Sequence, residues 1–244
     1  MRNLKMIIAF DGSKYRGWQK QRNTDLTIQS KVETVLTKMT GEEIQVVGCG
    51  RTDSGVHAEN YVANFHTNCT LRIDAMLDYL YEYLPEDIVV KSMENAPDRF
   101  HARYNVKSKT YVYKINNHRF RNVFTRKYAF HLAEKLNLTE MKSAAEILIG
   151  THDFRSFTNM KNTDKSTLRT INYINVNEKD NIEIEVNGNG FLWNMVRVIA
   201  GTLIEAGKGN LKPNDIEKIL NEKKRMEAGP LAPAKGLFLR DVQY

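Results

Sequence analysis

The stretch Gly50-Arg51-Thr52-Asp53-Ser54-Gly55-Val56-His57 joins two strand-like runs, residues 44–49 and 61–65. It holds one carboxylate, and glycines near both ends let the backbone turn sharply or approach a ligand. Two interpretations fit Asp53: a nucleophile or acid/base in a basic loop, or a β-turn in which Asp53 and Ser54 hydrogen-bond their own backbone. The rest of the chain must decide between them.

Strands and helices alternate on both sides of this loop. Residues 5–10 form an apolar run that Asp11-Gly12 ends, as expected of a buried strand. Apolar residues at helical spacing between Thr27, a candidate N-cap, and Gly41 predict a helix. A second helix over 73–84 and a strand over 88–93 complete the order β-α-β-β-α-β.

The second half repeats that order with one extra helix. Residues 110–116, 169–176, 182–186 and 237–242 are strand-like, and the first of these puts two tyrosines and an isoleucine on one face. Helices are expected from Asn137, with Glu140 placed as in a capping box, over 192–203, and in a short segment after Pro213.

Together the elements predict an α+β fold. Two ferredoxin-like β-α-β-β-α-β halves would share a mainly antiparallel sheet, with a central cleft where a ligand binds. The pattern breaks near Pro97, so we expect domains at residues 1–104, carrying the Asp53 loop, and 105–244.

Composition narrows the class of protein. Apolar residues make up 41% of the 244 residues, which indicates a globular chain. No run is long enough to span a bilayer and no signal-peptide pattern opens the chain, so the cytoplasm is expected. The two cysteines show no metal-ligand spacing, and no cluster of carboxylates or histidines predicts a metal site. A metal-dependent phosphoesterase is therefore a weak alternative.

The net charge of +7 favours a polyanionic partner. Four cations surround Tyr15 and Trp18: Lys14, Arg16, Lys20 and Arg22. A second series comprises Lys107, Lys109 and Lys114, followed by His118, Arg119, Arg121, Arg126 and Lys127. Cations between aromatic residues suit phosphate contacts and base stacking in RNA or DNA. Ordinary solvated faces would look similar, so charge alone leaves both interpretations open.

Several single residues also allow two roles. Arg197 is either a solvated helix arginine or a cleft residue that pairs with Asp53 and keeps it ionised. Tyr111 is either a core aromatic or a stacking surface for a flipped base. His57 is either a ligand or general base, or a hydrogen-bonded structural histidine. The segment Phe100-His101-Ala102-Arg103 is either a linker or an RNA contact.

At these residues the chain closely resembles the bacterial tRNA pseudouridine synthase A family. Several motifs in the family's order cover nearly the whole chain: Asp11-Gly12-Ser13-Lys14-Tyr15-Arg16-Gly17-Trp18-Gln19, the Gly50 to Ala58 signature, Phe100-His101-Ala102-Arg103, Lys109-Thr110-Tyr111-Val112-Tyr113, His152-Asp153-Phe154, Met195-Val196-Arg197 and Gly236-Leu237-Phe238-Leu239.

The resemblance implies roles for individual residues. Asp53 would be the catalytic aspartate, Tyr111 the active-site tyrosine, Arg197 the basic partner of the aspartate, and Arg51 an arginine that helps to extrude the target nucleotide. It further implies a homodimer that binds RNA across both subunits, and no cofactor or metal. We also expect RNA contacts from basic and histidine residues: Lys14, Arg16, Lys20, Arg22, His57, His101, Arg103 and Lys109.

The implied reaction isomerises uridine to pseudouridine in structured RNA, most simply at positions 38–40 of the tRNA anticodon stem-loop. Isomerisation involves no net redox change or hydrolysis, so it needs no cofactor. The chain departs from the family pattern at Glu59-Asn60-Tyr61, Tyr81-Glu82-Tyr83 and Leu231. Two alternatives stay open: a paralogue that performs the same chemistry on ribosomal RNA, and a non-catalytic RNA-binding module.

Overall fold

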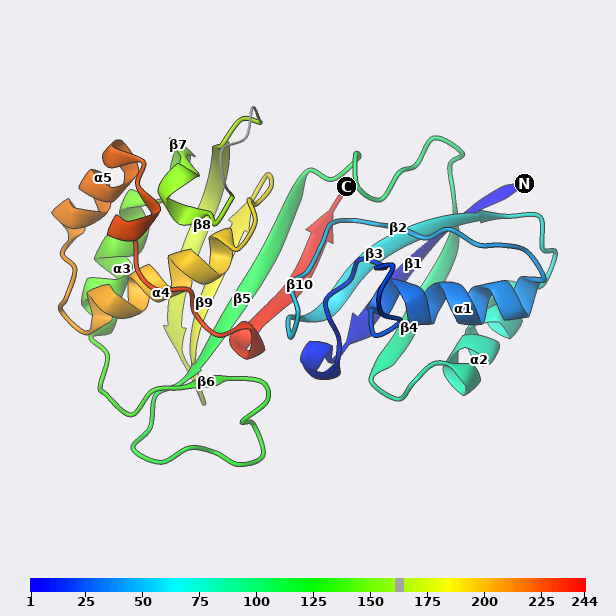
Figure 1. The fold of residues 1–244 in the computed structure, drawn as a ribbon, viewed down its shortest axis with the longest axis horizontal. Coiled ribbons are helices and arrows are strands. Elements are labelled where there is room, and N and C mark those ends of the chain that lie inside the picture. Colours follow the sequence, from blue (N-terminus) through cyan, green and yellow to red (C-terminus); the bar gives the residue numbers. More distant parts are fainter. Residues whose placement is uncertain (161–164) are drawn as a thin grey trace. The chain divides into compact units, whose positions relative to one another are not determined.

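The computed structural model describes residues 1–160 and 165–244, and these form two compact units (Figure 1). The first unit comprises Met1–Lys107 and Phe238–Tyr244, and the second comprises Ser108–Leu237. The expected domain boundary after residue 104 and the expected cleft stay predictions.

The first unit has a sheet of order β4-β1-β3-β10, with β2 paired to β3. The strands are β1 (Arg2–Phe10), β2 (Val47–Gly48), β3 (His57–Thr67), β4 (Ile88–Ala96) and β10 (Leu237–Gln243). All of these pairs are antiparallel except β10 with β3. Alternate residues of β1, from Leu4 to Phe10, are buried, so the sheet has one core face.

Two helices, α1 (Ile28–Thr40) and α2 (Ile73–Tyr83), lie side by side in this unit (Figure 1). The hydroxyl of Thr27 accepts a hydrogen bond from the Ser30 backbone N–H, and Gly41 ends α1 with a φ of 70°. Both ends of this helix match the prediction, because an N-cap side chain and a left-handed glycine are local signals.

The second unit has the strand order β5-β9-β8-β7, with β6 paired to β5. Its strands are β5 (Ser108–Asn116), β6 (Phe130–His131), β7 (Gly150–Asp153), β8 (Leu168–Glu178) and β9 (Ile182–Gly188), and its helices are α3 (Leu138–Ile147), α4 (Met195–Gly207) and α5 (Pro213–Glu222). Figure 1 shows the helices gathered beside β8 and β9. The α+β class with a mostly antiparallel sheet is confirmed.

Three expectations about elements were wrong or incomplete. Residues 44–49 are not one strand, because the N–H groups of Ile44 and Val46 donate to side chains of α1 instead of to a neighbouring strand. Leu192 precedes α4, since Asn194 adopts a left-handed conformation (φ 64°) that delays the helix to Met195. The short strands β6 and β7 were not anticipated.

Part of the segment from Asp153 to Arg169, considered as an RNA-clamping loop, lies at 161–164, outside the described residues. Before that gap, Phe154 and Phe157 are fully buried in a 3₁₀ turn. This part of the segment therefore belongs to the core of the second unit.

Candidate functional site

The Asp53 loop lies between β2 and β3, and the segment from Tyr15 to Trp18 holds it in place. The Gly55 N–H and the Ser54 hydroxyl both donate to the Tyr15 carbonyl oxygen, at 3.3 and 3.1 Å, and the Trp18 N–H donates to the Thr52 carbonyl oxygen at 3.3 Å. Both flanks of Asp53 are thus hydrogen-bonded to one other segment. Asp53 is half-buried, so its side chain stays partly accessible.

Two glycines explain why this second segment approaches so closely. A Cβ atom on Gly12 would lie 1.9 Å from the Val56 carbonyl oxygen, and one on Gly17 would lie 2.3 Å from the Thr52 carbonyl oxygen. Gly17 also has a φ of +85°, which side chains disfavour. The glycines of the Asp-Gly-Ser and Gly-Trp-Gln parts of the sequence therefore let the backbone of this segment pack directly against the backbone of the Asp53 loop.

Stacked aromatic rings support the loop from the core of the first unit. Trp18 stacks on Tyr61 with ring centroids 3.9 Å apart, and Phe10 packs against the same ring at 5.7 Å. The Tyr61 hydroxyl donates to the Gly50 carbonyl oxygen. Tyr61, one of the departures from the family pattern, is fully buried and therefore supports the loop rather than contacting a substrate.

His57 is buried at the start of β3, with 1% of its surface exposed. Its Nδ1 accepts a hydrogen bond from the Gly12 N–H at 3.1 Å, and its ring stacks on Phe238 at 4.6 Å. The Asp11 carboxylate also lies 3.1 Å from Nδ1. Because the Gly12 N–H already points at this nitrogen, we assign Nδ1 as an acceptor, and the contacts favour the structural interpretation of His57.

The Arg51 side chain is oriented by a line of amides that ends in a buried acid. Its Nε donates to the Gln19 side-chain oxygen at 3.2 Å; Gln19 donates to Gln29 at 2.6 Å, and Gln29 donates to Glu33 at 2.8 Å. The Lys20 N–H donates to the same Gln29 oxygen, which fixes which way this amide points. This arrangement was not predicted, since the only local signal for it is the i, i+4 spacing of Gln29 and Glu33 on α1.

The basic cluster near Tyr15 is only partly as expected. Tyr15 and Trp18 are 5% and 2% exposed, so they are core residues and do not form a base-stacking surface. Burial and a hydrogen bond to Asp87 raise the pKa of Tyr15 far above its usual value. The prediction that these aromatic residues stack on bases was wrong, because they pack in the core and anchor the segment that carries the cations.

The four cations themselves lie at the surface of the first unit. The ammonium groups of Lys14 and Lys20 lie 3.3 Å from Asp87 and 3.0 Å from Glu33. Arg16 and Arg22 have exposed side chains with no hydrogen bond or ion pair to any residue that the structure describes. These two arginines are the more available of the four for phosphate contacts.

The segment Phe100 to Arg103 is tied to the sheet of the first unit. The Asn64 side chain accepts a hydrogen bond from the Ala102 N–H at 2.8 Å, and the Asn3 side chain donates to the Phe100 carbonyl at 2.9 Å. His101 stacks on Tyr104 at 4.2 Å, and Arg103 is exposed. This arrangement leaves Arg103 available at the surface.

Tyr111 and Lys109 lie on β5 of the second unit. Tyr111 pairs with Val186 of β9, is 9% exposed, and meets Phe191 edge to face at 5.2 Å. Lys109 is half-buried two residues earlier on the same strand. The ring of Tyr111 is therefore held in place by its neighbours and is mostly buried.

Arg197 lies on α4, where the segment after Gly229 fixes it. Its Nε donates to the Ala232 carbonyl oxygen at 2.8 Å and its Nη1 to the Asn194 side chain at 3.3 Å. The side chain is half-buried, which argues against a freely solvated arginine. Asp53 belongs to the first unit and Arg197 to the second, and their expected pairing stays a prediction.

No three His, Cys, Asp or Glu residues within 1–160 and 165–244 come together in a way that could hold a metal ion. In the same ranges, every helix is too short or too polar to cross a membrane.

Comparisons with known proteins agree with these observations. A family model described as tRNA pseudouridine synthase matches residues 6–105 and 144–244. The chain is 69% identical to "tRNA pseudouridine synthase A 1" of Clostridium tetani and 48% identical to "tRNA pseudouridine synthase A 2" of Bacillus cereus, each over 100% of both chains. Among solved structures, an archaeal box H/ACA Nop10–Cbf5 complex matches 93% of this chain and 60% of that chain, with a TM-score of 0.40 and 12% identity, too weak a likeness to support an inference.

Proposed function

The chain belongs to the tRNA pseudouridine synthase family, and we propose that Asp53 is the carboxylate on which its reaction depends. The enzyme is an isomerase that converts uridine in tRNA to pseudouridine. The observation that supports this role is the loop itself: hydrogen bonds hold the backbone on both sides of Asp53, while its side chain stays accessible.

The chemistry explains why one fixed carboxylate suffices. The reaction breaks the bond between N1 of the base and C1′ of the sugar, turns the base and joins C5 to C1′. The proton lost from C5 is balanced by the proton that N1 gains, so the product is an isomer of uridine. A carboxylate can attack the substrate or stabilise the charge that develops on the sugar, as in glycoside chemistry. Because the loop that carries the carboxylate is already held in place, little structural rearrangement is needed as the reaction proceeds.

Tyr111, Arg197 and Arg51 complete the proposal. Tyr111 would stack on the turned base, since its ring is held by β9 and Phe191. Arg197 would keep the aspartate ionised, and its contacts to Ala232 and Asn194 support a fixed guanidinium. Arg51 would help to move the target nucleotide out of its stack.

For the substrate, we propose uridines of the tRNA anticodon stem-loop, bound in the cytoplasm by a homodimer. The support is similarity to relatives named tRNA pseudouridine synthase A over the whole chain. The departure at Tyr61 gives no support for a different RNA, since that ring is buried under the loop. Tyr81 and Tyr83 are exposed on α2 and remain available for contacts.

Asp53→Asn tests the proposal. We expect the single-turnover rate of pseudouridine formation in a tRNA transcript to fall at least about a thousandfold. The dissociation constant for the same tRNA should stay within about twofold, because phosphate contacts dominate the affinity. Asp78→Asn, an exposed acid on α2, is the matched control and should keep full activity. Retained activity in Asp53→Asn would refute the catalytic role. Loss of activity together with a collapse of tRNA affinity would show that Asp53 is structural.

A further inference from the structure

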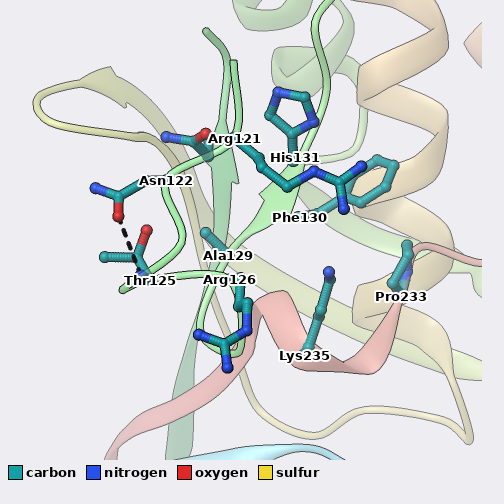
Figure 2. Close-up of a pocket in the computed structure, with 10 residues that line it drawn as sticks. Arg121, Asn122, Thr125, Arg126, Ala129, Phe130, His131, Pro233 and Lys235 are labelled. Carbon is teal, nitrogen blue, oxygen red and sulfur yellow. Dashed lines mark hydrogen bonds between the residues drawn. The ribbon is translucent and has the colours of Figure 1, made fainter.

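A pocket of the second unit is lined by none of the residues that the proposed function uses. It has a volume of about 200 Å³ and lies between the end of β5, the segment 121–131 and the turn that contains Pro233 and Lys235 (Figure 2). This volume is smaller than the roughly 300 Å³ at which pockets for drug-sized ligands begin. The pocket therefore suits one compact group rather than an extended ligand.

The charge of this pocket is entirely positive. Arg121, Arg126 and Lys235 line it, and none of its described lining residues is an Asp or Glu. Arg121 and Lys235 are exposed and form no hydrogen bond or ion pair with any residue described by the structure. Figure 2 shows both side chains extending toward the same space. Unpaired cations around a concave surface repel each other unless an anion enters.

The remaining lining residues include an aromatic ring and an amide, which can contact parts of a ligand other than an anionic group. The half-buried ring of Phe130 forms part of the wall. Asn116 is 6% exposed, and its side-chain oxygen is buried without a hydrogen-bond partner among the described residues. An unpaired buried acceptor is unfavourable, and an N–H group on the edge of a nucleobase can satisfy it. The cations can bind a phosphate, the Phe130 ring can stack on a base, and the Asn116 amide can hydrogen-bond to the edge of that base. Together these groups match the parts of a nucleotide.

The walls of the pocket are held in place before any ligand binds. The Tyr113 hydroxyl and the Gly236 N–H both donate to the Pro233 carbonyl oxygen, at 2.9 and 3.4 Å. On the opposite side, the Asn122 side chain accepts hydrogen bonds from the N–H groups of Phe124 and Thr125. A wall fixed in this way can bind a ligand without a large ordering cost.

We propose that this pocket holds one nucleotide of the tRNA, with its phosphate between Arg121 and Lys235 and its base beside Phe130 and Asn116. This choice of ligand rests on the proposed function, because the nucleotide is taken to be part of the tRNA substrate. Asn116 lies five residues from Tyr111 on β5, a separation of about 17 Å along the strand. The bound nucleotide is therefore distinct from the uridine that reacts.

The phosphate half of the proposal is tested by salt dependence. In fluorescence anisotropy with a labelled tRNA transcript, the full-length double variant Arg121→Gln/Lys235→Gln should bind about tenfold more weakly. The slope of log affinity against log salt should become shallower by about one, as expected when one phosphate contact is lost. The matched control Arg119→Gln/Lys127→Gln removes the same charge from the same loop, outside the pocket, and should change the slope by less than half as much.

The base half is tested by Phe130→Leu against Phe120→Leu, an exposed aromatic of the same loop. Phe130→Leu should weaken binding about threefold or more with an unchanged salt slope, because stacking releases no counterions, whereas Phe120→Leu should have little effect. The proposal is overturned if the double variant changes affinity and slope no more than its control. It is also overturned if the two leucine variants behave alike, since the pocket would then hold phosphate only.

These outcomes are separate from the fate of the proposed function. Anisotropy measures equilibrium binding and does not depend on isomerisation. Full activity in Asp53→Asn would refute the catalytic role while leaving a positive pocket result standing. An Asp53→Asn variant that is inactive but binds tRNA normally, with a negative pocket result, would refute only the pocket.

Discussion

The Arg51 side chain is oriented through a series of neighbouring side chains. Its side-chain hydrogen bond goes to Gln19, whose amide is oriented by Gln29 and, through it, by the buried Glu33. Gln19→Met keeps the length of this exposed side chain and removes the acceptor. We expect the single-turnover rate at saturating tRNA to fall about five- to tenfold, the effect of losing a partly solvated hydrogen bond of about 1 kcal/mol, with little change in melting temperature.

Gln21→Met is the control, because Gln21 is an exposed glutamine of the same segment that contacts the Arg16 backbone instead. If Gln19 acts only through Arg51, the double variant Gln19→Met/Arg51→Met should be no slower than Arg51→Met alone. Additive losses would mean that Gln19 contributes in some other way. A fully active Arg51→Met would instead refute the role of Arg51 itself.

Single residues were predictable from the sequence where a local rule applies. The turn around Asp53 and the caps at Thr27 and Gly41 follow from residue type and spacing. The burial of Tyr15 and Tyr61 did not follow, because a tyrosine between polar residues has the same local pattern whether it stacks on RNA or on Trp18. That choice depends on contacts between segments that are distant in sequence.

At the scale of elements, the order β-α-β-β-α-β was predicted in both halves, but several boundaries were not. Ile44 and Val46 look like a strand because they alternate, yet side chains of α1 occupy their N–H groups. Residue type and spacing cannot reveal such competition, since the partners come from another element. The two-residue strand β6 is likewise too short to leave a periodic signal.

Helix α4 gives the prediction that belongs to this scale. A Cβ atom on Gly201 would lie 1.8 Å from the Pro230 carbonyl oxygen, so the helix touches the following segment backbone to backbone. Ala is the better helix former by about 1 kcal/mol, but we expect Gly201→Ala to destabilise the protein by about 2 kcal/mol because of this overlap. The shift should also reduce activity, since Ala232 in that segment holds Arg197.

Urea unfolding and single-turnover rates check this expectation. Gly190→Ala is the control, because its Cβ atom would meet only the Arg169 side chain, at 3.8 Å. A stabilised Gly201→Ala variant would show that helix propensity outweighs the close approach.

For the whole molecule, composition and motif order indicated an α+β enzyme that acts on RNA, and the comparisons support tRNA as the substrate. Arg121 and Arg126 were among the cations noted in the sequence, but the pocket that they line together with Lys235 was not predicted. Arg121 and Arg126 lie more than a hundred residues from Lys235 in the sequence, and only the folded chain brings Lys235 to them. Net charge predicts a polyanionic partner without locating where it binds.

Buried tyrosines make the stability of the molecule sensitive to alkaline pH. Burial raises the pKa of Tyr113 far above its ordinary value of about 10, although the nearby positive charge of Arg197 opposes this shift. In the unfolded chain the phenol loses its proton near pH 10, while in the native protein it stays protonated. The contribution to stability is therefore complete below pH 10 and is lost progressively above it, at up to about 1.4 kcal/mol per pH unit.

Urea unfolding between pH 8.5 and 11.5 tests this dependence. Tyr113→Phe should be less stable at pH 8.5, because the hydrogen bond to Pro233 is lost, but its stability should fall less steeply with pH than that of the parent chain. Tyr81→Phe, at a tyrosine that is 79% exposed, should leave the steepness unchanged. Equal slopes in the parent and Tyr113→Phe would mean that other groups govern alkaline unfolding, such as Tyr15 and Tyr244, whose pKa values are also raised by burial.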